Sequence, residues 1–326
     1  MAIAGAGVAG AYLYKLLSKD EARIDVYDVK HKTKCGMSPC AWVTSKGFIE
    51  HVEASGLDPN KYILQQIDQV AVDDMKVKVE VMTIDKPSFV NDLLQGADIK
   101  YTPLDVNKYD RVIDATGLSR TFLRPVKEDI LSSCIQYCVQ NKNRLEPRVE
   151  PGKIGYAWCF HLSNNRYHIG CGSLAENPSL VLKDLGWLEK YKLNPGKNTL
   201  CGCAGKVRIT GPHHSEPFMS EGPSEGIWGV GEAIGCVGSV VGDGIVPGMR
   251  SAQILINNWD NPDSYRESIL KEFSWIHNER KLVDKLRNMA PLNMGDAWVL
   301  KNNSKRIGVN VGLTEAAMYA KRLKNA

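Results

Sequence analysis

The sequence predicts an α/β fold, and three observations lead to that prediction. A short apolar strand over residues 1–4 runs into three glycines spaced G-x-G-x-x-G, and a helical stretch follows over residues 11–17. A second apolar stretch, residues 23–27, ends on an aspartate. Far along the chain, an apolar strand near residue 227 leads to another glycine-rich turn, after which a helix begins near residue 244. Strands that alternate with helices in this order are typical of a parallel sheet covered by helices.

The first block has the order strand, glycine turn, helix, strand, acid, which predicts a Rossmann-like dinucleotide site. The first glycine permits the tight turn, the second lets the backbone approach a pyrophosphate, and the third lets the helix pack closely on the strand. The helix N-terminus then offers unpaired N–H groups to the phosphates. The acid is placed to accept hydrogen bonds from ribose hydroxyls. The residues expected at the dinucleotide are Gly5, Gly7, Val8, Ala9, Gly10 and Asp28.

Two later blocks add further small-residue turns. Residues 109–117 form an apolar strand that runs into Ala115, Thr116 and Gly117. Residues 227–235 form a strand that ends at Gly231 and Glu232, and the turn 242–251 follows. Turns of small residues let the backbone lie against a cofactor.

In this order, the three blocks resemble the FAD-binding motifs of the flavoprotein hydroxylase superfold. Within it, Gly242-x-Gly244-Ile245 followed by small residues resembles the geranylgeranyl reductase branch, whose members saturate isoprenoid double bonds. Aromatic hydroxylases usually carry an Asn at the place of Ile245. Residues 86–94 also resemble the R-x-x-F-x-x-x-L segment of the family, with Lys86 in place of Arg.

The resemblance implies that FAD is the cofactor. It implies that the carboxylate of Glu232, which stands where the family usually has Asp, binds ribityl hydroxyls, and that the helix beginning near Gly244 directs its N-terminus at the flavin ring. A Cys-Gly pair after the ribose-binding strand is also close to the flavin in the family, and its thiol is a candidate proton donor. The further cofactor contacts implied are Cys35, Gly36, Ala115, Thr116, Gly117, Gly231, Gly242 and Ile245.

Residues 154–162 match a second signature of the branch, Y-x-W-x-F. Strand alternation places Tyr156, Trp158 and Phe160 on one face, which Ile154 and Leu162 extend. From spacing alone this face is the core side of a sheet; the resemblance implies instead a substrate wall. It also implies substrate contact at His161, where the family often has Pro, and makes Cys35 and Tyr156 the candidate catalytic residues.

Other cysteines and histidines suggest no separate site. Nine cysteines without framework spacing indicate reduced thiols. Cys134 and Cys138 are interpreted as one face of a buried helix. Cys201 and Cys203, with His213 and His214 downstream, lack the spacing of a zinc site, so no metal is expected. His168, like His161, is either a proton donor or a hydrogen-bonded residue of a sheet.

The expected architecture is a three-layer ββα FAD-binding domain with a mostly antiparallel substrate domain and C-terminal helices. The FAD-binding domain takes residues 1–120 and 222–262, the substrate domain 121–221, and the helical region 263–326. In the last region, an Asn-Pro pair at residues 261–262 indicates a helix start. Apolar residues then recur at helical spacing, which favours packing on the body over a membrane-dipping role.

Composition sets outer limits on function. The chain has 326 residues, of which 43% are hydrophobic, and a net charge of +4. No basic run interleaved with aromatics suggests nucleic acid, and no apolar stretch is long enough to cross a bilayer. We therefore expect a cytoplasmic protein that visits a membrane surface to meet a lipid.

The predicted activity is reduction of C=C bonds in isoprenoid chains. Archaeal membrane lipids, a quinone side chain and free geranylgeranyl diphosphate remain open as substrates. No second dinucleotide fingerprint is present, so the reductant can be ferredoxin, a deazaflavin or NAD(P)H. Two alternatives stand: a flavin-dependent monooxygenase or other flavin dehydrogenase of the same superfold, and a non-catalytic lipid carrier that retains FAD.

Overall fold

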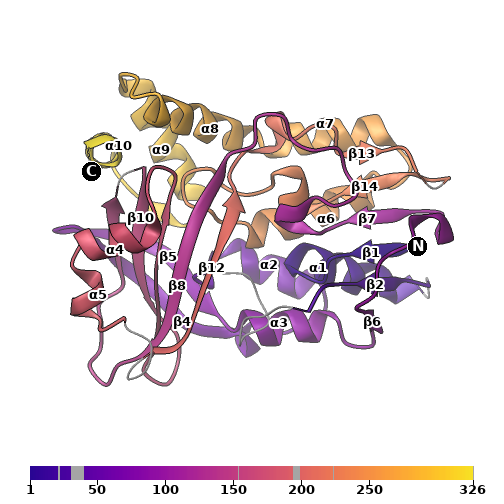
Figure 1. Ribbon diagram of the computed structural model, residues 1–326, viewed down its shortest axis with the longest axis horizontal. Helices are drawn as coiled ribbons and strands as arrows, with labels where there is room; N and C mark the ends of the chain where they lie inside the picture. Colours follow the sequence, from indigo (N-terminus) through magenta and orange to yellow (C-terminus); the bar gives the residue numbers. More distant parts are fainter. Residues whose placement is uncertain (21–22, 31–39, 153, 194–198, 223, 326) are drawn as a thin grey trace.

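A computed structural model describes residues 1–20, 23–30, 40–152, 154–193, 199–222 and 224–325, and two sheets organise them (Figure 1). The smaller sheet has six described strands in the order β13-β14-β7-β1-β2-β6. All neighbouring pairs in it are parallel except β13 with β14. The strands are β1 (Ala2–Ala4), β2 (Asp25–Tyr27), β6 (Ile99–Lys100), β7 (Val112–Asp114), β13 (Met219–Ser220) and β14 (Ile227–Gly229). The α/β fold class predicted from the sequence is confirmed.

Helices cover this sheet as the glycine pattern predicts. Helix α1 (Val8–Leu17) follows β1 and packs against both α3 (Lys86–Leu93) and α6 (Ile245–Asn257). Its residues 11–13 are fully buried. A Cβ atom at Gly10 would lie 2.0 Å from the carbonyl oxygen of Gly5, so only glycine allows α1 to approach β1 this closely. Helix α2 (Gly47–Ala54) contacts α6.

The larger sheet has nine described strands and is almost wholly antiparallel. Its order is β12-β8-β11-β10-β9-β4-β5-β15, and β3 pairs with β5. Only the pair β4 with β9 is parallel. The strands are β3 (Val43–Ser45), β4 (Ile63–Val72), β5 (Met75–Ile84), β8 (Leu131–Gln140), β9 (Arg148–Gly152), β10 (Gly155–His161), β11 (Arg166–Ser173), β12 (Thr199–Arg208) and β15 (Val309–Asn310).

One secondary-structure expectation is wrong. Cys134 and Cys138 lie on strand β8, not on a helix. A spacing of four residues also fits one face of a strand, where side chains repeat every two residues. Strand β8 pairs with β11 on one side and β12 on the other, so backbone hydrogen bonds to distant segments determine its conformation.

The C-terminal region is helical. It contains α7 (Pro262–Glu272), α8 (Ser274–Arg287), α9 (Met294–Arg306) and α10 (Leu313–Asn325), while two short helices, α4 (Pro178–Asp184) and α5 (Trp187–Lys190), lie beyond β11. Asn261 caps α7 by accepting a hydrogen bond from the Ser264 N–H at 2.9 Å. The apolar face expected here is buried and packs in the core. Among the described residues, no helix is both long and apolar enough to cross a membrane.

Candidate cofactor and substrate site

The three small-residue blocks meet at the edge where the parallel strands end. A Cβ atom at Gly5 would lie 2.2 Å from the carbonyl oxygen of Ala115, and one at Gly231 would lie 2.7 Å from the Cβ atom of Ala9. The hydroxyl of Ser251 on α6 accepts a hydrogen bond from the Gly231 N–H at 2.9 Å. The turns that follow β1, β7 and β14 are therefore in direct contact, although more than a hundred residues separate them in the chain.

Gly7 differs from its neighbours because no described atom lies within 4 Å of a Cβ atom built on it. It is the N-cap of α1, and no side chain of the described residues caps the first N–H groups of that helix. These groups are therefore free to receive an external anion. Asp28, which follows β2, is half-buried and its N–H donates to the Lys100 carbonyl at 3.1 Å.

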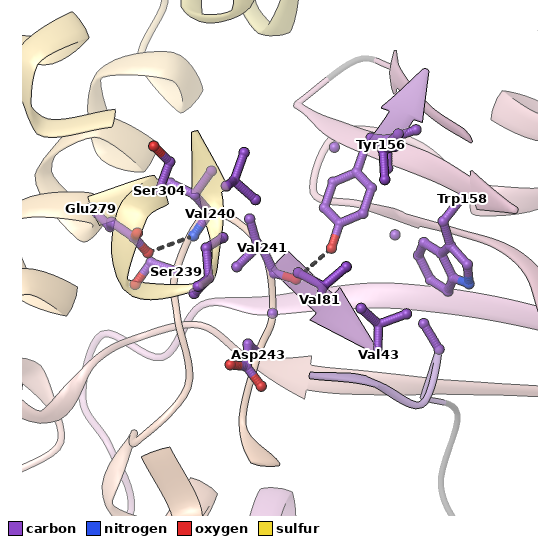
Figure 2. A pocket seen from close by; sticks show the side chains of 18 of the residues that line it. Val43, Val81, Tyr156, Trp158, Ser239, Val240, Val241, Asp243, Glu279 and Ser304 are labelled. Carbon is purple, nitrogen blue, oxygen red and sulfur yellow. Dashed lines mark hydrogen bonds between the residues drawn. The ribbon is translucent and has the colours of Figure 1, made fainter. Parts of the chain in front are cut away.

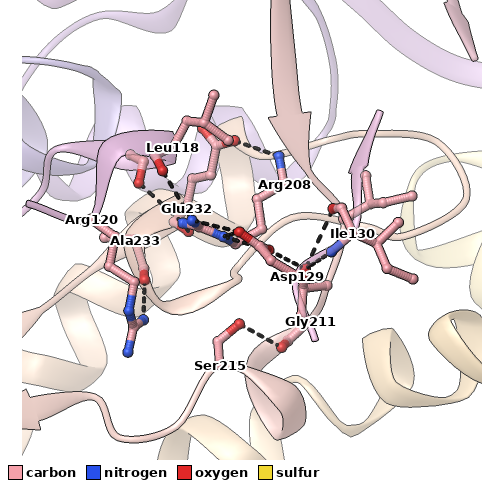
Figure 3. A network of polar contacts seen from close by, with 12 residues as sticks. Leu118, Arg120, Asp129, Ile130, Arg208, Gly211, Ser215, Glu232 and Ala233 are labelled. Atoms are coloured by element: carbon pink, nitrogen blue, oxygen red, sulfur yellow. Dashed lines mark hydrogen bonds and ion pairs between the residues drawn. The ribbon is translucent and has the colours of Figure 1, made fainter. Parts of the chain in front are cut away.

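Arg208 at the end of β12 joins the turns after β7 and β14. Its guanidinium pairs with Asp129 at 2.9 Å and donates to the carbonyls of Leu118 at 2.9 Å and Glu232 at 3.2 Å (Figure 3). Its backbone N–H donates to the Glu232 carboxylate at 2.7 Å. A Cβ atom at Gly117 would lie 3.3 Å from Glu232 Oε2, which places that carboxylate against the turn containing Ala115, Thr116 and Gly117. Burial raises the pKa of Glu232.

A second buried arginine supports the same region. Arg120 lies directly after the turn at Gly117 and has a left-handed backbone conformation, with a φ of 44°. It donates to the carbonyls of Arg124, Ala233 and Pro217. Neither Arg120 nor Arg208 was singled out in the sequence, because no local pattern distinguishes a buried arginine from the exposed ones.

An apolar cavity of about 360 Å³ begins at the turn 242–245, which contains Gly242, Gly244 and Ile245. It runs along the larger sheet, where valines of β4 and β5 form one wall, and reaches helices α8, α9 and α10. Its lining is mostly aliphatic, and this size and character suit an apolar ligand.

Strand β10 places its aromatic residues in this cavity. Tyr156, Trp158 and Phe160 all line it, as does Ile154, whereas Leu162 packs in the core beside the smaller sheet. Trp158 lies opposite Gly170 on β11, where a Cβ atom would come within 2.6 Å of the indole. The Tyr156 hydroxyl donates to the Val241 carbonyl (Figure 2).

His161 and His168 do not line the cavity. His161 stacks on Tyr167 with ring centroids 4.8 Å apart, on the other face of the strand. His168 is buried against Trp42, and its Nδ1 lies 3.3 Å from the Ala41 carbonyl. Burial lowers the pKa of His168 to about 4, which makes it a neutral residue of the sheet.

The cavity wall includes three ionisable side chains whose charged forms are disfavoured by burial. Burial raises the pKa of Asp243 to about 6, that of Glu279 to about 7 and that of the Cys134 thiol to about 11. Asp243 accepts a hydrogen bond from the Ile245 N–H at 3.1 Å, so a carboxyl group stands at the N-terminus of α6. Sequence reasoning missed Asp243, Glu279 and the position of Cys134.

The remaining sequence candidates do not line the cavity or fall outside the described residues. Cys35 and Gly36 lie outside the described residues. Cys201 and Cys203 are on β12, and His213 and His214 stack or tilt against His277. Among the described residues no group of three possible ligands is arranged to hold a metal ion.

A search for related sequences finds one distant relative. An uncharacterized protein of Methanocaldococcus jannaschii is 27% identical over 346 aligned positions, which cover 86% of this chain and 90% of that protein. No family model matches the sequence.

Solved structures share the fold at low sequence identity. A geranylgeranyl bacteriochlorophyll reductase-like protein from Thermoplasma acidophilum aligns with a TM-score of 0.69 and 17% identity, covering 87% of this chain and 86% of that one. A flavoprotein/dehydrogenase from Cytophaga hutchinsonii aligns with a TM-score of 0.62 and 12% identity, covering 99% of this chain and 91% of that one. A probable FAD-dependent monooxygenase from Pseudomonas aeruginosa aligns with a TM-score of 0.59 and 12% identity, covering 87% of this chain and 95% of that one. The chain therefore has a flavoprotein fold, consistent with the resemblance to the geranylgeranyl reductase family.

The Arg208–Asp129 pair predicts a large stability loss on substitution. R208A should lower the free energy of unfolding by about 3 kcal/mol, because it leaves Asp129 and several buried carbonyls without their partner. Chemical denaturation measures this change. R266A is the matched control, since Arg266 pairs with Glu216 while its side chain is 47% exposed, and it should cost about 1 kcal/mol or less. Equal losses in the two variants would contradict the structural role given to Arg208.

Proposed function

We propose that this protein is an FAD-dependent oxidoreductase that reduces C=C bonds of isoprenoid chains. The single observation that carries the proposal is the apolar cavity that starts at the glycine turn 242–245 and is walled by the aromatic strand β10. The turn belongs to the cofactor half of the fold and the strand to the larger sheet. The cavity therefore joins the two halves at the place where the family resemblance puts the flavin ring.

The chain's own residues fit FAD. The open space at Gly7 and the uncapped start of α1 suit the pyrophosphate, and Asp28 at the end of β2 suits the ribose. Glu232 lies against Gly117, where its carboxylate can accept from ribityl hydroxyls. A Cβ atom at Gly242 would also meet no atom within 4 Å in the part of the chain that the structure describes, so this turn too presents bare backbone.

The cavity favours a flexible hydrocarbon chain over a polar substrate. Valines at positions 70, 72, 77, 79 and 81 form one wall of it. Such a surface excludes water. Reduction of an isolated alkene needs a water-free site, because an isolated alkene is a poor hydride acceptor. The wall also holds the chain by contact along its length, and orientation of the double bond over the cofactor follows from that contact.

FAD, when bound, supplies the hydride for one alkene carbon, and a proton must reach the other. Of the two candidate donors, Cys35 lies outside the described residues. Tyr156 lies on the cavity wall with its hydroxyl donating to the Val241 carbonyl. We propose Tyr156, Cys35 or water as the proton source.

The assay that tests the proposal is anaerobic. The purified protein is loaded with FAD, reduced with dithionite, and mixed with geranylgeranyl-bearing lipids or geranylgeranyl diphosphate, and the substrate mass is followed. We expect a gain of two hydrogen atoms per reduced double bond. Dithionite replaces the physiological donor, which we leave as ferredoxin, a deazaflavin or NAD(P)H.

Two other results would redirect the proposal. Turnover that requires oxygen and adds an oxygen atom would identify a flavin-dependent monooxygenase. Unchanged lipid mass, with FAD bound and reducible, would exclude the isoprenoid reductase and leave only an FAD-dependent oxidoreductase. Bound FAD that is not reduced and reoxidised with any lipid would support a lipid carrier, which the valine-lined cavity alone suits as well as a reductase.

Cofactor binding is tested by a pair of glycine variants. G7A should fold with unchanged stability, because a Cβ atom there meets no atom of the described residues within 4 Å, but should weaken FAD binding at least tenfold by filling the space for the pyrophosphate. G10A should instead lose stability, because its Cβ atom would lie 2.0 Å from the Gly5 carbonyl. Flavin fluorescence and thermal unfolding measure the two effects. Full FAD affinity in folded G7A would show that the cofactor does not bind here.

The protein also needs a surface from which a lipid can enter, and we propose the outer face of α9. Met294 and Trp298 are 63% and 60% exposed and lie one turn apart, and Met289 just before the helix is 63% exposed. Lys301 and Lys305 continue this face of α9. Exposed Trp and basic residues together suit an anionic membrane surface. The same helix contributes Leu300 and Ser304 to the cavity.

Vesicle binding tests this surface. We expect the protein to sediment with vesicles that contain phosphatidylglycerol and more weakly with phosphatidylcholine alone. The double variant M294S/W298S should lose roughly tenfold or more in vesicle affinity while retaining activity on detergent-dispersed substrate. L180S, which removes a 53% exposed leucine on α4, is the control and should bind normally. Equal binding by all three proteins would exclude this face.

A further inference from the structure

The segment between the short helix η6 (Gly231–Ile234) and α6 is called here the cofactor-side loop, residues 235–244. It folds back on itself, because the Gly242 N–H donates to the Gly238 carbonyl and the Gly238 N–H to the Asp243 carbonyl, both at 2.9 Å. Its last residues form the turn at the end of the cavity. The position of this loop therefore determines where cavity and cofactor half meet.

Two side chains hold the loop from opposite sides (Figure 2). Tyr156 on β10 donates its hydroxyl to the Val241 carbonyl. Glu279 on α8 accepts a hydrogen bond from the Val240 N–H at 3.1 Å. The loop is thus fixed between the aromatic strand and a C-terminal helix.

Glu279 is an unusual side chain for this position. It is 3% exposed and lines a mostly apolar wall. Its remaining polar neighbours are the Ser239 N–H and the Asn303 side chain, and no cation forms an ion pair with it within the described part of the chain. A buried carboxylate without a counter-charge is costly, so burial raises the pKa of Glu279 to about 7.

The charged groups around Glu279 do not balance the negative charge of its ionised carboxylate. Asp243 on the loop is a like charge that adds a smaller increase to the pKa of Glu279, and burial raises its own pKa to about 6. Arg280, its neighbour on α8, is directed at the Thr210 carbonyl and Asp284. His277 on the same helix packs against His213 and His214.

We propose that Glu279 is a positioning residue that links protonation of the cavity wall to the cofactor-side loop. The inference rests on the proposed FAD binding. When neutral, Glu279 holds the loop without placing charge behind it. When ionised, it places a negative charge beside Asp243 and the turn 242–245. This charge disfavours the additional negative charge that two-electron reduction brings to a flavin at that turn.

The test is the reduction equilibrium of the FAD-loaded protein as a function of pH. Between pH 6 and pH 8 the equilibrium constant for two-electron reduction of bound FAD should fall about tenfold more in the wild type than in E279Q, which corresponds to about 30 mV for a two-electron couple. D284N removes a carboxylate from the same helix, but one paired with Arg280 near the surface, and should follow the wild type. Parallel pH curves for wild type and E279Q would overturn the proposal.

A second measurement needs no flavin. The pKa of Glu279 in the folded protein, about 7, lies above its usual value near 4.5. The protonated carboxyl group therefore stabilises the fold at low pH, and this contribution is lost as the pH rises through about 7. The cofactor-free wild type should therefore lose stability relative to E279Q between pH 5 and pH 8. If the stability difference is constant with pH, Glu279 does not titrate as proposed. If it changes but FAD does not bind, only the proposed function fails.

E279Q should fold, because Gln keeps an oxygen acceptor for the Val240 N–H. Should it fail to fold, infrared titration of the wild type replaces it. The protein at pH 6 should then show a protonated carboxyl signal that is lost by pH 8, and this loss should persist in D243N. Absence of any such signal in D243N would overturn the assignment to Glu279.

Discussion

The whole site depends on how closely the turns after β1, β7 and β14 approach one another. The Gly5 backbone lies so near the Ala115 carbonyl that a Cβ atom would be 2.2 Å from it, and Gly231 is similarly close to Ala9. No side chain larger than hydrogen fits at either position without moving the backbone. This contact brings the uncapped start of α1, the turn at Gly117 and the Glu232 carboxylate to one edge of the sheet. Buried arginines then hold the turns from outside, because their guanidinium groups can satisfy several carbonyl oxygens at once.

The cofactor-side loop connects this arrangement of turns to the larger sheet. Its hydrogen bonds within residues 238–243 make it a compact unit, and the Tyr156 hydroxyl and the Glu279 carboxyl attach that unit to β10 and α8. The cavity is thus built by three regions that are distant in sequence. The valine strands, the cofactor-side loop and the C-terminal helices α8, α9 and α10 all contribute to its lining.

The sequence predicted the features that arise from local pattern and left out those that arise from assembly. The glycine spacing predicted β1, α1 and the turn, since the close packing of Gly10 on the Gly5 carbonyl arises within this one segment. The alternation of Tyr156, Trp158 and Phe160 predicted a common face, and the structure shows it. Cys134 and Cys138 were misplaced because a spacing of four suits a helix and a strand alike, and pairing with two distant strands decided the matter. Glu279 could not be found, because a glutamate within the polar sequence of α8 looks like its exposed neighbours until α9 and the loop cover it.

Buried carboxyl groups in an aliphatic cavity require an explanation in physical terms. Hydrophobic residues of similar volume at positions 243 and 279 would avoid the desolvation of two acids. The loop geometry supplies part of the reason, because Asp243 satisfies the Ile245 N–H and Glu279 the Val240 N–H, which would otherwise be buried without acceptors. An amide side chain would meet the same need with no charge. What a carboxyl group adds is a charge that appears near neutral pH, beside the turn where the two halves of the molecule meet. The choice of acid over amide is therefore better explained by control of charge at the site than by stability.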